Sequence, residues 1–203
     1  MKGYYFITDE DLSAAGILSD AETAAAAGVD VIQYRNKTAE TRRIYDEARL
    51  IKKICGSGRC RFIINDRVDI ALAVDADGVH IGQEDMPFEV ARRLLGKEKI
   101  IGVTVHTVEE AVEAEGSGAD YLGVSPIFST GTKSDAGAPC GVDTLAAIRR
   151  ACGIPLVAIG GIDLSNADEC IRAGADMVCA ISAVVARPDV AAEIKNFQRK
   201  FGL

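Results

Sequence analysis

The segment AGVDVIQYRNK, residues 27–37, contains the pattern that decides the fold. Gly28 follows a helix-like stretch, and glycine commonly ends a helix because it adopts the left-handed conformation easily. The apolar pair at 31–32 then begins a short strand, and the sequence turns polar directly after it. Related small-residue turns precede three later strand-like runs, at residues 75–78, 117–120 and 173–176. The chain is therefore expected to repeat one unit, a helix followed by a turn and a buried strand.

Short apolar runs alternate with longer amphipathic stretches along the whole chain. We expect strands at residues 4–8, 31–34, 61–64, 78–81, 100–104, 121–124, 156–159 and 177–180. We expect helices near residues 19–27, 39–55, 67–74, 87–95, 107–116, 143–151, 166–173 and 189–200. This alternation indicates a parallel sheet covered on both faces. An open, doubly wound sheet would show it too, but the even spacing of the cycles favours an α/β fold with a single (β/α)8 barrel domain over residues 1–203.

In such barrels the active site lies at the carboxyl ends of the strands. Gln33, Arg35 and Lys37 alternate at the end of the second strand, so their side chains share a face. An amide and two cations on one wall suit an anion with several oxygens. An exposed basic strand end is the simpler interpretation of an isolated Arg-x-Lys pattern, but the other strand ends supply matching groups.

Two carboxylates follow neighbouring strands, Asp66 after the third and Asp85 after the fourth. Each also stands where a helix would begin, and taken alone each is best interpreted in that way. Facing Arg35 and Lys37, however, a pair of carboxylates suits an anion site only if a cation bridges them to the anion. Mg²⁺ takes one or two protein carboxylates together with waters and phosphate oxygens. The pair therefore predicts a magnesium–diphosphate site.

The later strand ends predict a second anion site. Residues 126–139, after the sixth strand, form a small-residue loop long enough to act as a lid. Gly161 and Ser182 follow the seventh and eighth strands, where barrels of this kind recurrently bind a monophosphate. Thr104, at the end of the fifth strand, can offer a hydroxyl to the pocket. The loop residues suited to anionic oxygens are Thr130, Thr132 and Lys133.

The composition limits the partners and the compartment. The 203 residues are 48% hydrophobic, which is enough for one large core. The formal net charge of −7 disfavours nucleic acid and anionic membranes as partners. No apolar run approaches transmembrane length, and Asp9 interrupts any signal-peptide core. The six cysteines are irregularly spaced without a Cys-x-x-Cys pair, which favours reduced thiols in a soluble, cytoplasmic protein.

The machinery of several common mechanisms is missing from the sequence. It contains no nucleophile elbow, P-loop or zinc-ligand cluster. Its two histidines are His80, inside an apolar strand and expected to be structural, and His106, expected at the surface or behind the site. The chemistry is therefore expected to need no covalent nucleophile.

Taken together, the motifs resemble the thiamine-phosphate synthase family. They run in one order along nearly the whole chain: QYRNK at 33–37, INDR at 64–67, GVHIGQED at 78–85, TGTK at 130–133 and IGGI at 159–162. The resemblance implies a (β/α)8 transferase that joins hydroxymethylpyrimidine diphosphate to a thiazole monophosphate. It also implies release of diphosphate and Mg²⁺ as cofactor.

The resemblance further implies a role for each matched residue. Those expected to bind the pyrimidine diphosphate are Gln33, Arg35, Lys37, Asn65, Thr104 and Lys133. Among them Arg35, Lys37 and Lys133 would act in catalysis, while Asp66 and Asp85 would hold Mg²⁺. Those expected around the thiazole phosphate are Thr130, Thr132, Gly161, Ile181 and Ser182. Thr104 departs from the serine that the family usually has, so the hydroxyl is retained with an additional methyl group.

Other functions share part of this pattern. A thiazole tautomerase of related fold would need the monophosphate site but neither the basic wall nor the acidic pair. A non-catalytic binder of thiazole or thiamine phosphate would need no metal pair and no lid. A sugar-phosphate isomerase or aldolase would need a Schiff-base lysine or an acid/base pair. The expected partners are small-molecule substrates, and a homo-oligomer is compatible with the sequence.

Overall fold

The computed structural model describes residues 1–56, 60–132 and 137–203. Eight parallel strands form a closed barrel in the order of the sequence. They are β1 (Gly3–Ile7), β2 (Val31–Tyr34), β3 (Arg61–Asn65), β4 (Gly78–Ile81), β5 (Ile100–Val105), β6 (Tyr121–Val124), β7 (Leu156–Ile159) and β8 (Met177–Cys179). The barrel closes because β1 pairs with both β2 and β8, with Gly3 opposite Met177. The predicted (β/α)8 barrel is confirmed, and the open-sheet alternative is wrong.

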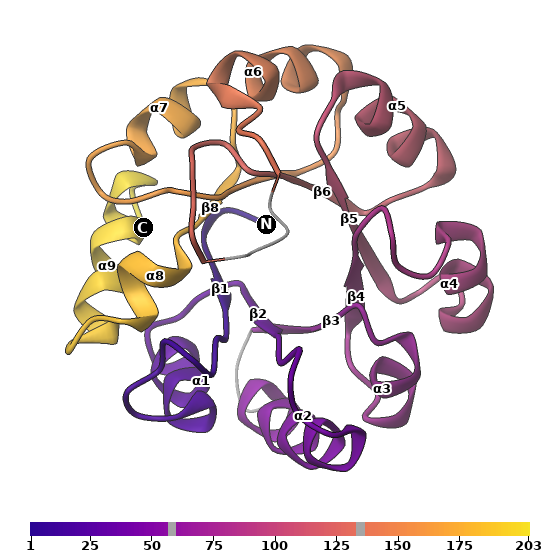
Figure 1. The fold of residues 1–203 in the computed structure, drawn as a ribbon, viewed down its shortest axis with the longest axis vertical. Coiled ribbons are helices and arrows are strands. Elements are labelled where there is room, and N and C mark those ends of the chain that lie inside the picture. The colour runs from indigo at the N-terminus through magenta and orange to yellow at the C-terminus, as the bar shows by residue number, and fades with distance from the viewer. Residues whose placement is uncertain (57–59, 133–136) are drawn as a thin grey trace.

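Helices form an outer ring around the strands, as Figure 1 shows. They are α1 (Ile17–Ala26), α2 (Thr41–Gly56), α3 (Val68–Ala73), α4 (Phe88–Leu95), α5 (Val108–Ser117), α6 (Gly141–Ala151), α7 (Ala167–Arg172), α8 (Ile181–Val185) and α9 (Val190–Lys200). The short helix α8 was not expected from the sequence. It begins directly after β8, at one of the predicted phosphate-binding positions.

The strands are buried on both faces, which explains their uninterrupted apolar runs. In β1, β2, β4, β6 and β7 every residue is buried. The ring of helices covers the outer face, where for example Tyr4 of β1 stacks on Phe197 of α9 with ring centroids 5.2 Å apart. Inward-facing side chains fill the barrel, as is usual for this architecture.

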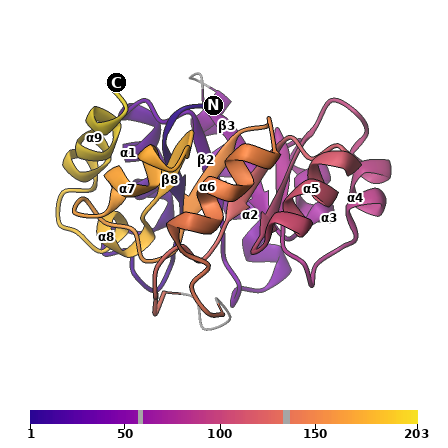
Figure 2. The ribbon, with the colours of Figure 1, turned by 90° about the horizontal axis from the view of Figure 1, so that it is seen from above.

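The two ends of the chain lie at the same end of the barrel (Figure 2), where the side chain of Leu203 lies beside Gly3. The described part of the chain has no helix that is both long and apolar enough to cross a membrane.

Candidate active site

Arg35 is held by the segment that follows β1. Its backbone N–H donates to the hydroxyl of Thr8 over 2.9 Å, and this hydroxyl donates to the Arg35 carbonyl over 3.2 Å. The guanidinium Nη1 lies 3.4 Å from a carboxylate oxygen of Asp9, and both side chains are largely buried. Asp9 also accepts a bond from the N–H of Leu12, so this carboxylate ties Arg35 to the segment after β1. These contacts fix the orientation of Arg35.

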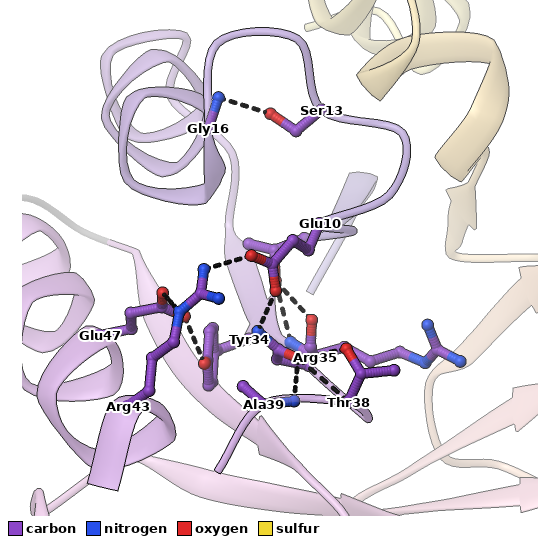
Figure 3. A network of polar contacts seen from close by, with 11 residues as sticks. Glu10, Ser13, Gly16, Tyr34, Arg35, Thr38, Ala39, Arg43 and Glu47 are labelled. Carbon is purple, nitrogen blue, oxygen red and sulfur yellow. Dashed lines mark hydrogen bonds and ion pairs between the residues drawn. The ribbon is translucent and has the colours of Figure 1, made fainter.

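A polar network braces the loop between β2 and α2 (Figure 3). Glu10 accepts bonds from the side chains of Asn36 and Arg43, and thereby joins the loop after β1 to helix α2. Arg43 also pairs with Glu47, whose second oxygen accepts a 2.6 Å bond from the hydroxyl of Tyr34. The Arg43–Glu47 pair has the spacing of neighbours on a helix and could have been found in the sequence. The contribution of Glu10 has no local signal.

Asp66 and Asp85 interact with each other at the carboxyl ends of β3 and β4. Burial, followed by the hydrogen bond and negative charge of Asp85, raises the pKa of Asp66 to about 6, and Lys37 opposes this rise. The Nζ of Lys37 lies 3.5 Å from an oxygen of Asp66. Asp85 accepts a 2.7 Å bond from the N–H of Gly82, which fixes its carboxylate. The structure thus brings the two predicted metal ligands together beside a cation.

Neither of these carboxylates caps the helix that follows it. The N-cap position belongs to Arg67 in α3 and to Pro87 in α4, and neither helix has a side-chain cap bond. Asp66 also adopts a φ of 60°, in the left-handed region that few residues other than glycine occupy. A backbone held in such a conformation is common at functional sites. Helices do begin two residues after Asp66 and three after Asp85, as their positions suggested, but neither carboxylate is the N-cap.

A cavity of about 410 Å³ opens at this end of the barrel. Of the predicted residues it is lined by Lys37, Asn65, Asp66, Asp85 and Thr104. A second cavity of about 400 Å³ contains Arg35 and Thr132 and shares Lys37 with the first. Arg35 and the pair Asp66 and Asp85 therefore line neighbouring cavities on either side of Lys37.

The residues present suit Mg²⁺. Burial is the largest cause of the raised pKa of Asp66, and Asp85 raises this pKa further because two carboxylates in contact repel each other. A divalent cation between them would relieve that repulsion. Among residues 1–56, 60–132 and 137–203, no cluster of three or more carboxylate, histidine or cysteine side chains could hold a metal. Two carboxylates are nevertheless enough for Mg²⁺, because waters and substrate phosphate complete its shell.

Hydrogen-bonded side chains cross the barrel interior beneath these cavities. Gln33 donates to the hydroxyl of Tyr5 over 2.9 Å, and this hydroxyl lies 2.7 Å from that of Tyr121. The Tyr121 hydroxyl lies 2.9 Å from Nδ1 of His80, whose Nε2 lies 2.8 Å from the hydroxyl of Thr104. We call these five residues the interior row. The sequence assigned a structural place to His80 but did not reveal the row, which joins five different strands, β1, β2, β4, β5 and β6.

The predicted second anion position lies between β6, β7 and β8. A small cavity of about 20 Å³ is lined by all five residues predicted around the thiazole phosphate: Thr130, Thr132, Gly161, Ile181 and Ser182. Gly161 has a φ of 64°, and a Cβ there would lie 2.5 Å from the carbonyl oxygen of Ser129. Only glycine therefore fits between this turn and the chain before Thr130. The first N–H groups of α8 have no acceptor within that helix.

Lys133 lies outside the described residues, and its predicted role stays a prediction. The same holds for the predicted lid, because part of the segment 126–139 falls outside the described ranges.

Comparisons with known proteins identify the same family that the sequence motifs resemble. A family model described as thiamine monophosphate synthase matches residues 4–184. The thiamine-phosphate synthase of Methanosarcina mazei is 54% identical over 194 residues, covering 96% of this chain and 80% of that protein. That of Chloroflexus aurantiacus is 50% identical over 195 residues, covering 96% and 90%. The structure of thiamine phosphate pyrophosphorylase from Pyrococcus furiosus superposes with a TM-score of 0.90 at 40% identity, covering 98% of this chain and 95% of that one.

Proposed function

Because the chain belongs to the thiamine monophosphate synthase family and is a transferase, we propose a specific condensation for it. The first substrate is hydroxymethylpyrimidine diphosphate. The second is the monophosphate of hydroxyethylthiazole or of its carboxylated form. The products are thiamine phosphate and diphosphate, and the carboxylated form would release carbon dioxide as well. The observation that carries the proposal is the pairing of two anion positions at one end of the barrel. One has Lys37, Asp66 and Asp85, and the other has Gly161 and Ser182.

The diphosphate is the leaving group in this reaction. Arg35 and Lys37 stabilise the negative charge that builds on it as the C–O bond breaks, and Lys133 would add a third cation. Mg²⁺, held by Asp66 and Asp85, would supply further charge neutralisation at the leaving oxygens. Removing one preorganised contact of this kind typically lowers the rate on the order of 100- to 1,000-fold.

The pyrimidine is oriented by polar groups deeper in the barrel. The Oε1 of Gln33 is buried and has no hydrogen-bond partner among the described residues. The amino group of the pyrimidine is a suitable donor for it, because a buried acceptor without a partner is costly. Asn65 and Thr104 line the same space as Lys37. Holding both substrates in one orientation supplies much of the remaining rate enhancement.

The substitution is dissociative. Departure of the diphosphate leaves a cation on the exocyclic carbon, and the electron-rich aminopyrimidine stabilises it. The thiazole nitrogen then forms the new C–N bond. This nitrogen carries no proton, so no general base is needed.

Product formation is the decisive experiment. The purified protein is mixed with both substrates and Mg²⁺, and thiamine phosphate is measured by its fluorescence after oxidation. We expect product only when both substrates are present. If no thiamine phosphate forms and thiazole phosphate is isomerised, the protein is a tautomerase. If no thiamine phosphate forms and thiazole phosphate is bound but left unchanged, the protein is a binder.

Lys133→Ala tests the cation outside the described residues. We expect it to lower turnover more than it weakens binding of thiazole phosphate, because a contact made mainly in the transition state affects kcat most. Rate and binding are therefore titrated separately. Equal losses in both would contradict a role in the transition state.

A further inference from the structure

The interior row contains His80, a buried ring that the proposed chemistry does not use. Only 4% of this residue is exposed. Its ring lies against that of Tyr121 with centroids 5.4 Å apart, and both ring nitrogens face hydroxyl groups. A neutral imidazole has one nitrogen that donates and one that accepts. The direction of the hydrogen bonds along the row therefore decides which nitrogen of His80 carries the proton.

The direction is set at Gln33. With Nε2 toward Tyr5, the amide leaves one buried oxygen without a partner among the described residues. With the amide reversed, two N–H groups would occupy that position instead. Buried N–H groups without acceptors are rarer in proteins than under-satisfied carbonyl groups. Gln33 is therefore the donor to Tyr5.

The remaining contacts follow from this first bond. Each buried hydroxyl has one proton, and this proton needs an acceptor. Because Gln33 already donates to Tyr5, Tyr5 donates to Tyr121, and Tyr121 in turn donates to Nδ1 of His80. Burial raises the pKa of both tyrosines above the usual value, so both hydroxyls keep their protons. His80 is left with its proton on Nε2, which donates to the hydroxyl oxygen of Thr104. Because Nε2 of His80 donates to the hydroxyl oxygen of Thr104, the proton of that hydroxyl points away from His80.

Two strand glycines show that the fold keeps space for these rings. A Cβ at Gly102 would lie 2.0 Å from Cζ of Tyr121, and a Cβ at Gly123 would lie 2.9 Å from Cε1 of His80. Both distances are too short for real contacts. The positions of the two rings are thus built into β5 and β6.

We propose that His80 is a positioning residue: as the neutral Nε2–H tautomer, it makes the hydroxyl of Thr104 a hydrogen-bond donor into the cavity lined by Lys37 and Asp66. The acceptor there is an anionic oxygen or a ring nitrogen of the pyrimidine substrate, so this assignment rests on the proposed function. The opposite tautomer would turn the proton of Thr104 toward His80. A lone pair would then face the substrate and repel an anionic oxygen.

The tautomer can be measured without turnover. The chain has only two histidines, so protein labelled with ¹⁵N in its imidazole rings gives two ring patterns in a long-range ¹⁵N–¹H spectrum. His106→Gln identifies the pattern of His80. We expect a protonated Nε2 and an unprotonated Nδ1 at neutral pH. A protonated Nδ1 in the spectrum of His80 would overturn the proposal whether or not the enzyme makes thiamine phosphate.

A matched pair of variants tests the consequence for catalysis. Glutamine can accept from Tyr121 and donate to Thr104 as the Nε2–H tautomer does, whereas leucine of similar size can do neither. We expect His80→Leu to lower kcat/KM for the pyrimidine diphosphate on the order of 10- to 100-fold, the usual value of a buried hydrogen bond to a charged group. His80→Gln should recover most of this loss. Equal losses in the two variants would overturn the proposal.

Two further measurements separate positioning from a general effect on the fold. Both His80 variants should bind thiazole phosphate as the wild type does, because that site lies at β6, β7 and β8. Tyr121→Phe should remove the Nε2–H pattern of His80 and lower kcat/KM in the same direction as His80→Leu. Tyr45→Phe, on the outer helix α2, is the control for loss of a tyrosine hydroxyl. An unchanged His80 pattern in Tyr121→Phe would count against the row.

Discussion

At the scale of single residues, Arg35 shows how surrounding groups prepare a cation for its ligand. Asp9 accepts a hydrogen bond from Nη1. The hydroxyl of Thr8 accepts from the backbone N–H of Arg35 and donates to its carbonyl oxygen. The Nε of Arg35 is buried and has no acceptor among the described residues. The guanidinium edge that contains Nε is the one that binds two oxygens at once. The surroundings therefore leave the bidentate edge for a phosphate group.

Arg35→Lys tests this arrangement while keeping the charge. We expect kcat/KM for the pyrimidine diphosphate to fall roughly 10- to 100-fold, because a lysine cannot pair with Asp9 and bind two oxygens together. Arg42→Lys, at an exposed position of α2, is the matched control and should change the rate less than 2-fold, roughly. Comparable losses in the two variants would show that the orientation of Arg35 is unimportant.

The sequence predicted the residues that follow the strands and missed the residues that hold them. Lys37, Asp66 and Asp85 were accessible because each follows a recognisable strand, and the barrel brings the strand ends together. The contact of Asp9 with Arg35 and those of Glu10 were missed because the partners lie 26 or more residues away in the sequence. Contacts of this kind leave no periodic pattern. Only closure of the barrel places them side by side.

At the scale of the elements, the strands β4, β5 and β6 make room for the interior row. A Cβ at Gly78 would lie 2.1 Å from the carbonyl oxygen of Ile100, so β4 and β5 also approach closely at that point. Strand boundaries were predicted within one residue, since both faces are apolar and the turns contain glycine. The glycines inside the strands gave no such guidance, because their role depends on a side chain of the neighbouring strand.

Gly102→Ala tests this packing. The new methyl group would meet the ring of Tyr121, so we expect the free energy of unfolding to fall by about 1–3 kcal/mol, the usual cost of overpacking. Gly116→Ala, inside helix α5 with open space around it, is the control and should stabilise the protein by roughly 0.5–1 kcal/mol. Denaturant unfolding measures both changes. Equal stability of the two variants would show that the ring of Tyr121 yields without cost.

At the scale of the whole molecule, the net charge is negative but two basic side chains, Arg35 and Lys37, line one cavity. The formal net charge is −7, yet Arg35 and Lys37 face one end of the barrel. Local cations, backbone N–H groups and an acidic pair suited to Mg²⁺ are enough for two anion sites in such a chain. A negative net charge therefore disfavours nucleic acid as a partner without disfavouring small phosphate ligands.

The thiols give a check on the fold as a whole. None of the six cysteines, all of which lie among the described residues, forms a disulfide, and Cys55, Cys152, Cys170 and Cys179 are buried. With Ellman's reagent we expect at most two thiols, Cys60 and Cys140, to react rapidly in the native protein. All six should react in guanidinium chloride. A smaller number in denaturant would reveal a disulfide that the structure does not contain.

The most direct test of the proposed active site measures the rate of thiamine phosphate formation as a function of free Mg²⁺ concentration. The wild type is compared with Asp66→Asn and Asp85→Asn. Asparagine is the chosen replacement because it tolerates the left-handed conformation of Asp66. We expect the wild-type rate to rise and saturate with Mg²⁺, and each variant to lose roughly 100-fold or more while its affinity for thiazole phosphate is unchanged. Mg²⁺-independent turnover at the wild-type rate in both variants would contradict the assignment of the acidic pair.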